Sequence, residues 1–339
     1  MNKDYIRVAV RPVKSLNAFT TYFAKSIRQG RFLVAELNEL KTYPFRSEIV
    51  LLHWPDEFFR KVSRRARVRR WIFLINATLS RCLFGQKVVW AVHNLVPHDS
   101  SSLKSTQIMR SFFSCLGGLI FFSQESRKVF TEVYPELSLV PFVITKHGRY
   151  PGPDLEFSPA HNAPGTPIKC ALVGYIRPYK SPMSLASAAA ALGKDAVSLT
   201  IAGLCANKQL AYDLSCVSSS TDNILFINEQ LSEVRFTEII DESDAIVIPY
   251  QSILNSGSAV HALSRYRRVI APRFPTLVEL QSAVGSDWVH LYDGSMSPDT
   301  LRKALVWAHN APKSEPDLSQ FEWEGIGSQL RDFLETVAR

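Results

Sequence analysis

Short runs of Val, Ile, Leu and Phe recur along the chain, and segments long enough for a helix separate them. Runs that are apolar at nearly every position are typical of strands that a parallel sheet buries on both faces. In the first half we expect strands at Ile6–Val10, Ile49–Leu52, Lys87–Val92, Leu119–Phe122 and Val140–Ile144. In the second half we expect them at Ile168–Val173, Val197–Ile201, Ile224–Ile227, Ala245–Ile248, Val269–Ala271 and Trp288–Leu291. The alternation of strands and helices predicts an α/β fold.

The composition changes between Tyr150 and Pro167, where five prolines interrupt any regular element. Such a segment is typical of a linker between domains. We therefore expect two α/β domains, residues 1–155 and 156–315, with a cleft outside the carboxyl ends of their strands. Residues 316–339 have helical spacing from Leu318 to Ala338 and are expected to cross back to the first domain.

The net charge of the 339-residue chain is +8, from 39 Lys and Arg against 31 Asp and Glu, which favours an anionic partner. Five scattered cysteines without a CxxC pair favour a reducing compartment and exclude a disulfide framework or a cysteine zinc site. No apolar run approaches the roughly 20 residues that cross a bilayer. We expect a cytoplasmic protein that contacts a membrane without crossing it.

Several common mechanisms lack sequence support, because the chain contains no GxGxxG, GxxxxGK[ST], HExxH or GxSxG motif. No two Asp residues have DxD spacing, the simplest arrangement for holding a nucleotide through a metal ion. We expect neither a metal nor a cofactor. A bound phosphate would be met by Arg, Lys, backbone N–H groups and a helix dipole.

Two segments that follow strands supply those groups. The first starts at Gly174 and carries Arg177 and Lys180, two cations that could pair with a diphosphate, although solvated loop cations have the same sequence. The second contains Tyr250 and continues through Asn255, Ser256, Gly257 and Ser258 into an apolar helix. Small residues at a helix start let N–H groups approach an anion, although an ordinary N-cap explains them equally. Together, the two segments predict a diphosphate site.

The first half contributes imidazoles and carboxylates instead. His53 and Asp56 follow one strand, and the next carries a loop with His93, Asn94, His98 and Asp99. Such groups could provide a general base for an incoming hydroxyl. A lone loop histidine is more often a structural hydrogen-bonding group, and this alternative stays open for each of them.

A basic segment at residues 60–70 holds seven cations and no acid, and Trp71 and an apolar run follow it. A basic helix flanked by aromatic residues is typical of a contact with anionic lipid or with a lipid diphosphate. Its candidate contact residues are Arg64, Arg65, Arg67 and Arg69. A nucleic-acid stripe is an alternative that no recognised motif supports, and we expect no nucleic-acid partner. A solvated helix face is the other alternative.

The blocks that carry the candidate groups occur in one order that resembles a known enzyme family. The chain is similar to glycosyltransferases of the GT-B type, and more closely to the bacterial exopolysaccharide β-mannosyltransferases of family GT94. The matching blocks are LHWPD at 52–56, HNLVPHD at 93–99, HGRY at 147–150, IRPYK at 176–180, PYQSILNSG at 249–257, VGSDWVHLYDG at 284–294 and PDLSQFEWEGIG at 316–327.

This resemblance implies two Rossmann-like domains, with the acceptor held by the N-terminal one and a nucleotide sugar held by the C-terminal one. It implies inverting, metal-independent transfer of mannose from GDP-mannose to a polyprenyl-diphosphate-linked oligosaccharide in exopolysaccharide biosynthesis. The enzyme would lie on the cytoplasmic face of the inner membrane as a peripheral protein. A UDP-sugar donor is the alternative within this class, and a GT-B-like protein that binds glycan or nucleotide without turnover is the alternative outside it.

The resemblance also implies roles for individual residues. Arg177 and Lys180 correspond to the diphosphate cations, residues 255–258 to the phosphate turn, and Asn228, Gln230 and Leu231 to the region that meets the base. Asp56 is the first candidate for the catalytic base, His98 and Asp99 follow, and His53 would orient it. His93, Asn94, His147 and Tyr150 belong to the acceptor side or the hinge. His261 stands where related enzymes with an EX7E motif have Glu, so a carboxylate bond to the ribose is not expected here.

Overall fold

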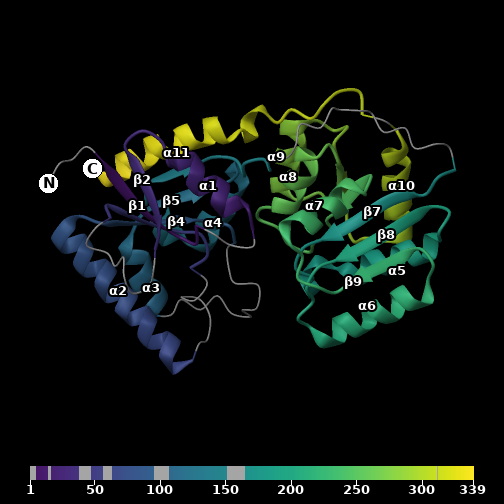
Figure 1. Ribbon diagram of the computed structural model, residues 1–339, viewed down its shortest axis with the longest axis horizontal. Helices are drawn as coiled ribbons and strands as arrows, with labels where there is room; N and C mark the ends of the chain where they lie inside the picture. Colours follow the sequence, from purple (N-terminus) through teal and green to yellow (C-terminus); the bar gives the residue numbers. More distant parts are fainter. Residues whose placement is uncertain are drawn as a thin grey trace. The chain divides into compact units, whose positions relative to one another are not determined.

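A computed structural model describes residues 5–13, 17–37, 47–55, 63–94, 107–150, 165–310 and 312–339. The chain divides into two compact units, the first made of Met1–Gly148 with Phe321–Arg339 and the second of Arg149–Gln320. Each unit contains a six-stranded sheet flanked by helices (Figure 1). All the described strand pairs are parallel. These sheets confirm the predicted α/β class.

The sheet of the first unit has the order β2-β1-β3-β4-β5-β6. Its strands are β1 (Ile6–Arg11), β2 (Phe32–Glu36), β3 (Ile49–Leu52), β4 (Lys87–Ala91), β5 (Leu116–Phe121) and β6 (Phe142–Ile144). Its helices are α1 (Phe19–Ile27), α2 (Arg64–Phe84), α3 (Gln107–Cys115), α4 (Gln124–Val133), the 3₁₀ turn η2 (Pro135–Leu137) and α11 (Trp323–Ala338). The last helix packs on α1, where the Arg331 guanidinium donates to the Ser26 carbonyl.

The sheet of the second unit has the order β12-β11-β10-β7-β8-β9. Its strands are β7 (Ile168–Val173), β8 (Val197–Ala202), β9 (Ile224–Ile227), β10 (Ala245–Val247), β11 (Arg268–Pro272) and β12 (Val289–Tyr292). Its helices are α5 (Pro182–Leu192), α6 (Lys208–Ser220), α7 (Glu233–Asp241), α8 (Gly257–Ser264), α9 (Pro275–Val284) and α10 (Pro298–His309), with the 3₁₀ turn η3 (Pro178–Lys180). A further 3₁₀ turn, η4 (Ser319–Phe321), precedes α11.

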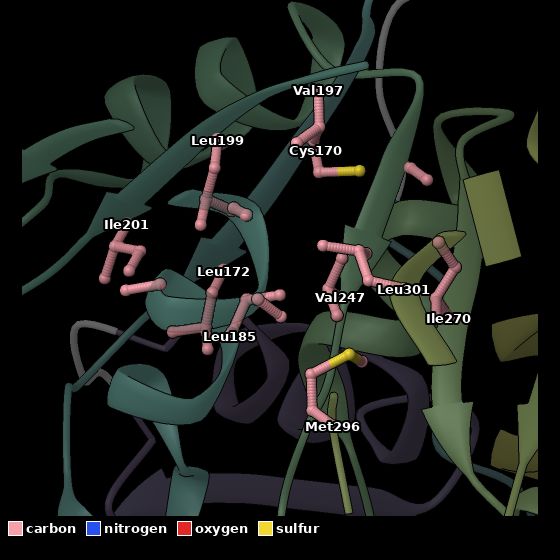
Figure 2. Close-up of a cluster of buried hydrophobic side chains, with 14 of the residues drawn as sticks. Cys170, Leu172, Leu185, Val197, Leu199, Ile201, Val247, Ile270, Met296 and Leu301 are labelled. Carbon is pink, nitrogen blue, oxygen red and sulfur yellow. The ribbon is translucent and has the colours of Figure 1, made fainter. Parts of the chain in front are cut away.

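One face of the second sheet forms a continuous apolar core with α5, α6 and α10. Figure 2 shows that Leu172 of β7 lies near Leu185 of α5 and that Val247 of β10 lies near Leu301 of α10 within this cluster. All four are almost fully buried. This packing stabilises the sheet and holds the carboxyl ends of its strands, which carry the candidate loops, in fixed positions.

Eleven of the twelve described strands coincide with predicted runs, and β2 is the exception. It is an edge strand of five residues, and β1 is its one partner among the strands that the structure describes. Leu33 on its outer face is half exposed, so the apolar run is short and broken by solvent-facing positions. No described helix is both long enough and apolar enough to cross a membrane. Most of the predicted linker, residues 151–164, and residues 60–62 of the basic segment lie outside the described residues.

Candidate functional site

The two segments predicted to meet phosphate lie side by side in the second unit. They follow β7 and β10, which are neighbours in the sheet, with Ala245 paired to Cys170. Because parallel strands end at the same edge, the loops meet there. The Gln251 N–H donates to the Tyr179 carbonyl at 2.8 Å. The rings of Tyr179 and Tyr250 pack edge to face, with centroids 5.7 Å apart.

Lys180 stands at the centre of this junction and is only 8% exposed. Its ammonium nitrogen lies 4.9 Å from the centroid of the Tyr250 ring, within the range of a cation–π contact. Burial is the main cause that lowers the pKa of Lys180 to about 8, and the nearby charge of Arg177 lowers it further, against an opposing effect of Tyr179. Among the described residues, no carboxylate forms an ion pair with Lys180.

Two like charges held close together, one of them buried, constitute an electrostatic cost within the folded chain. Arg177 is half-buried at the start of η3, and the Lys180 N–H donates to its carbonyl at 3.0 Å. An anion between the two cations would offset both the desolvation of Lys180 and its repulsion from Arg177. Lys180 is therefore a buried cation and not a solvated one, and an anion bound beside it stays a prediction.

The N-terminus of α8 completes this group. The Ser256 hydroxyl caps the helix by accepting from the Ala259 N–H at 3.2 Å, and Gly257 and Ser258 begin the first turn. The Ser258 hydroxyl contacts the Val173 carbonyl at 3.5 Å and also hydrogen-bonds to Tyr250. The first N–H groups of a helix have no partner within it and favour negative charge. We call Gly174, Arg177, Lys180, Tyr250 and Ser258 the cradle.

Glycine is required where the loops after β7 and β8 approach each other. Gly174 has a φ of +103°, and a Cβ there would lie 3.6 Å from the Lys180 ammonium and 3.9 Å from the Ser258 hydroxyl. Gly203 has a φ of +142°, and a Cβ there would lie 2.0 Å from the Gly174 carbonyl oxygen. A side chain at Gly203 would displace the first cradle residue.

The loop after β9 lies next along the same sheet edge. The Asn228 side-chain oxygen accepts from the Cys205 N–H at 2.9 Å, which ties this loop to the one after β8. Gln230 is exposed and Leu231 is half-buried. Their predicted contact with the base of a nucleotide stays a prediction.

His261, in the place of the missing Glu, is a buried residue of α8. Its ring lies between Tyr150, with centroids 4.2 Å apart, and Phe236, with centroids 5.3 Å apart. Its Nε2 lies 3.2 Å from the Thr237 hydroxyl. Burial and the charge of Arg265 lower the pKa of His261 to about 4, against Asp241, so the imidazole is neutral at pH 7. Because both ring faces are covered, His261 packs the helix.

The predicted histidines of the first unit also come together. His53, His93 and His147 follow β3, β4 and β6, and Nδ1 of His53 lies 3.0 Å from Nε2 of His93. Aromatic rings surround them: Phe19 lies against all three, with centroids 4.1 to 6.0 Å away. We call these histidines the imidazole cluster.

Burial disfavours the charged form of two imidazoles of the cluster, those of His53 and His93. It lowers the pKa of His53 to about 3, with a smaller effect of His147, and it lowers that of His93 well below the ordinary value. The Nε2 atom of His53 is buried and has no hydrogen-bond partner among the described residues. His53 and His93 can therefore position the loops after β3 and β4, whereas their low pKa opposes the uptake of a proton near neutral pH.

Comparison with known proteins identifies the class. The chain is 26% identical over 302 residues to the GDP-mannose:glycolipid 4-beta-D-mannosyltransferase of Xanthomonas campestris pv. campestris. The alignment covers 87% of this chain and 81% of that enzyme. No protein-family profile matches the chain.

Solved structures show the same architecture. HepE of Anabaena in complex with UDP-glucose aligns over 98% of this chain and 97% of its own, with a TM-score of 0.60 and 12% identity. The UDP-forming alpha,alpha-trehalose-phosphate synthase of Burkholderia xenovorans aligns over 99% and 100%, with a TM-score of 0.62 and 11% identity. The chain is a GT-B glycosyltransferase.

The structure describes only some of the other predicted site residues of this glycosyltransferase. Asp56, His98 and Asp99, the first candidates for the catalytic base, lie outside the described residues. Asn94, three positions after the end of β4, is half-buried. The Tyr150 N–H donates to the Ser264 hydroxyl at 3.0 Å. The described residues contain no group of three His, Cys, Asp or Glu side chains that could hold a metal ion.

Sequence reasoning missed two features of the glycosyltransferase. Gly203 was not singled out, although a glycine directly after a buried strand signals a close backbone approach. The rings of Phe19 and Trp323, whose centroids lie 5.5 Å apart, were not connected with the predicted histidines. No local signal reveals that association, because the two residues are 304 positions apart in the chain (323 − 19).

Proposed function

We propose that this glycosyltransferase transfers mannose from GDP-mannose to a polyprenyl-diphosphate-linked oligosaccharide and inverts the anomeric configuration. The similarity to the Xanthomonas enzyme carries the choice of substrates, because its name states a GDP-mannose donor and a glycolipid acceptor. The cradle supports the donor, since Lys180 and Arg177 form a cationic pair that a diphosphate would neutralise. The proposed role is a step of exopolysaccharide biosynthesis, in an enzyme of family GT94.

In the proposed reaction the cradle holds the leaving group. The bond between the anomeric carbon and the diphosphate oxygen breaks, and its electron pair stays on the diphosphate. Arg177, Lys180 and the first N–H groups of α8 would stabilise the charge that develops there, and such preorganised groups contribute on the order of 3 kcal/mol each. Because these groups supply positive charge, we propose that the reaction needs no metal ion.

On the acceptor side, a base removes the proton from the hydroxyl that attacks the opposite face of the sugar. We propose Asp56 for this role, with His98 and Asp99 as the next candidates. The imidazole cluster supports this placement, because the buried His53 is the first residue after β3 and stands three positions before Asp56 in the chain. A lipid-linked acceptor also requires the enzyme to work at a membrane surface, and we propose the cytoplasmic face of the inner membrane.

A UDP-sugar is the second candidate donor. One observation favours it: HepE, whose fold this chain shares, has been solved with UDP and with UDP-glucose. The cradle does not discriminate between the two donors, because both present the same diphosphate to Lys180 and Arg177.

A thermal-shift panel separates these donors, because a ligand that binds only the folded state raises its melting temperature. The panel contains GDP, GDP-mannose, UDP and UDP-glucose, each with Mg²⁺ and with EDTA. We expect GDP and GDP-mannose alone to raise the melting temperature, and the shift to persist in EDTA. A shift with UDP ligands alone would overturn the mannose donor, and a shift abolished by EDTA would overturn metal independence.

Variants then test the cradle and the transfer itself. Lys180→Met should weaken GDP binding about 100-fold, a loss typical of a charge-assisted contact. Lys194→Met, which removes an exposed lysine from the same unit, is the matched control and should bind as the wild type does. Transfer of radiolabelled mannose into a lipid extract tests the reaction, and binding of GDP-mannose without transfer to any lipid-linked acceptor would favour a protein without turnover.

A further inference from the structure

The helix α2 presents an apolar stripe to the solvent. It begins after the N-cap Ser63 and ends at Gly85, whose φ of +69° is left-handed. Figure 1 shows α2 beside α3 at the margin of the first unit. Its inner face is buried and consists of Arg70, Leu74, Ala77 and Ser80. The opposite face should be polar in an ordinary surface helix.

That opposite face is apolar instead. Val68, Ile72, Ile75, Leu79 and Leu83 follow one another at spacings of four, three, four and four, so they form one line along the helix. Their exposed fractions range from 46% to 66%. At 1.5 Å per residue, the line is roughly 22 Å long. We call these five residues the α2 stripe. Scattered exposed apolar residues need no explanation, but a continuous line of them marks an interaction surface.

The charge of α2 indicates what covers the stripe. The helix contains six arginines and no acidic residue. Arg64, Arg65, Arg67 and Arg69 are exposed in its first two turns, and Trp71 lies at the side of the stripe, 38% exposed. A second copy paired through this face would bring two strongly cationic helices together, which like-charge repulsion opposes. An anionic surface matches both the arginines and the apolar line.

We infer that the α2 stripe inserts into the interface of an anionic lipid bilayer, with the helix axis parallel to the surface. In this position the five apolar side chains enter the boundary between headgroups and acyl chains, and the exposed arginines meet lipid phosphates. The inference rests on the proposed function in one respect, because a lipid-linked acceptor places the enzyme at such a surface. It goes further by assigning the contact to one face of one helix.

Vesicle flotation tests the inference. The probe is a vesicle of phosphatidylcholine and phosphatidylglycerol at a ratio of about 7:3, and vesicles of phosphatidylcholine alone are the comparison. We expect the wild type to float with the anionic vesicles. Ile72→Ser/Ile75→Ser should lower the partition coefficient about tenfold or more, because it removes the two central apolar side chains. Val234→Ser/Val306→Ser, which removes two apolar side chains of the second unit that are even more exposed, should leave the partition coefficient unchanged.

We expect the arginines and the α2 stripe to contribute differently to vesicle binding. Arg64→Gln/Arg65→Gln/Arg67→Gln should reduce the preference for anionic over neutral vesicles, and raising the salt concentration should have the same effect on the wild type. A blue shift of tryptophan emission on vesicle binding should be smaller in Trp71→Phe. Unchanged melting temperatures and unchanged GDP shifts would show that each variant is folded.

Three results would overturn the inference. The wild type could fail to float, or the Ile72→Ser/Ile75→Ser variant could float equally well. Alternatively, sedimentation velocity could show that the wild type is a dimer and Ile72→Ser/Ile75→Ser a monomer, while neither protein binds vesicles. This result would assign the stripe to self-association. Flotation is measured without donor or acceptor, so its outcome is independent of the mannose-transfer assay, which is run with a detergent-dispersed acceptor.

Discussion

At the level of single residues, the surroundings of Lys180 alter its protonation. It is buried against Tyr250 and close to the charge of Arg177, and these surroundings place its pKa near 8 rather than above 10. A lysine in this state is partly deprotonated at mildly alkaline pH. An anion that requires the protonated form therefore binds less tightly as the pH rises through that range.

The loss of the Lys180 proton should weaken nucleotide binding as the pH rises. The dissociation constant for GDP, measured by isothermal titration calorimetry, should rise about fourfold between pH 7 and pH 8.5, as expected for a group with a pKa near 8. Lys180→Arg keeps its charge over this range, so its dissociation constant should stay constant whatever its absolute value. Equal pH dependence in the wild type and in Lys180→Arg would show that another group titrates.

His261 allows a second prediction at this scale. In the folded chain its pKa is about 4, against 6.5 for the free side chain, so between these values the unfolded chain binds a proton that the folded chain does not. Stability therefore falls as the pH is lowered from about 6.5 toward 4, with a contribution on the order of 2 kcal/mol between pH 7 and pH 5.

Unfolding in urea at pH 7 and pH 5 measures this contribution. His261→Gln should be less stable than the wild type at pH 7, because it loses the ring contacts with Tyr150 and Phe236. It should also lose less stability on acidification. The matched control is His309→Gln at an exposed position, and it should show the wild-type pH dependence. A His261→Gln protein with that same dependence would contradict the argument.

At the level of elements, the contact between the loops after β7 and β8 restricts the cradle most. Gly203→Ala would combine a left-handed backbone with a Cβ 2.0 Å from the Gly174 oxygen. We expect it to lower the free energy of unfolding by about 3 kcal/mol. It should also weaken GDP binding, since Gly174 must move.

Gly193→Ala is the control that measures the cost of a left-handed backbone without a steric clash. Gly193 has a φ of +78°, but a Cβ there would meet no atom within 4 Å. Its cost should be about 1 kcal/mol, with GDP binding unchanged. Urea unfolding and calorimetry compare the two variants, and an equal effect on GDP binding would show that the loop contact does not position the cradle.

At the level of the whole molecule, the last helix belongs to the first unit although it follows the second in the chain. Leu330 of α11 is fully buried. Leu330→Ala should destabilise that unit by about 2 to 5 kcal/mol, as is usual for such a cavity. The cradle lies in the other unit, so the dissociation constant for GDP should change less than twofold, within the scatter expected for independent sites.

Leu83→Ala, at an exposed position of α2, is the control and should change stability by less than about 0.5 kcal/mol. Differential scanning calorimetry with and without GDP separates the two units, because the nucleotide raises the transition of the unit that binds it. A Leu330→Ala variant that loses nucleotide binding would contradict this division.

We could predict the α/β class, eleven of the twelve described strands and the resemblance to GT-B glycosyltransferases from the amino-acid sequence alone. These depend on local periodicity and on the order of short motifs, which a linear chain displays directly. The sequence also predicts a phosphate site at Arg177, Lys180 and residues 255–258, because such groups follow apolar runs and precede helices. The edge strand β2 was missed, since its exposed outer positions, such as Leu33, break the apolar run.

Which of these groups lie close together depends on the tertiary structure. β7 and β10 are neighbours in the sheet, although two further strands separate them in the chain, and this brings Lys180 against Tyr250. Packing covers both faces of His261, gathers three distant histidines around Phe19, and turns the apolar line of α2 toward solvent. Burial depends on contacts between remote segments, and these have no counterpart in local sequence.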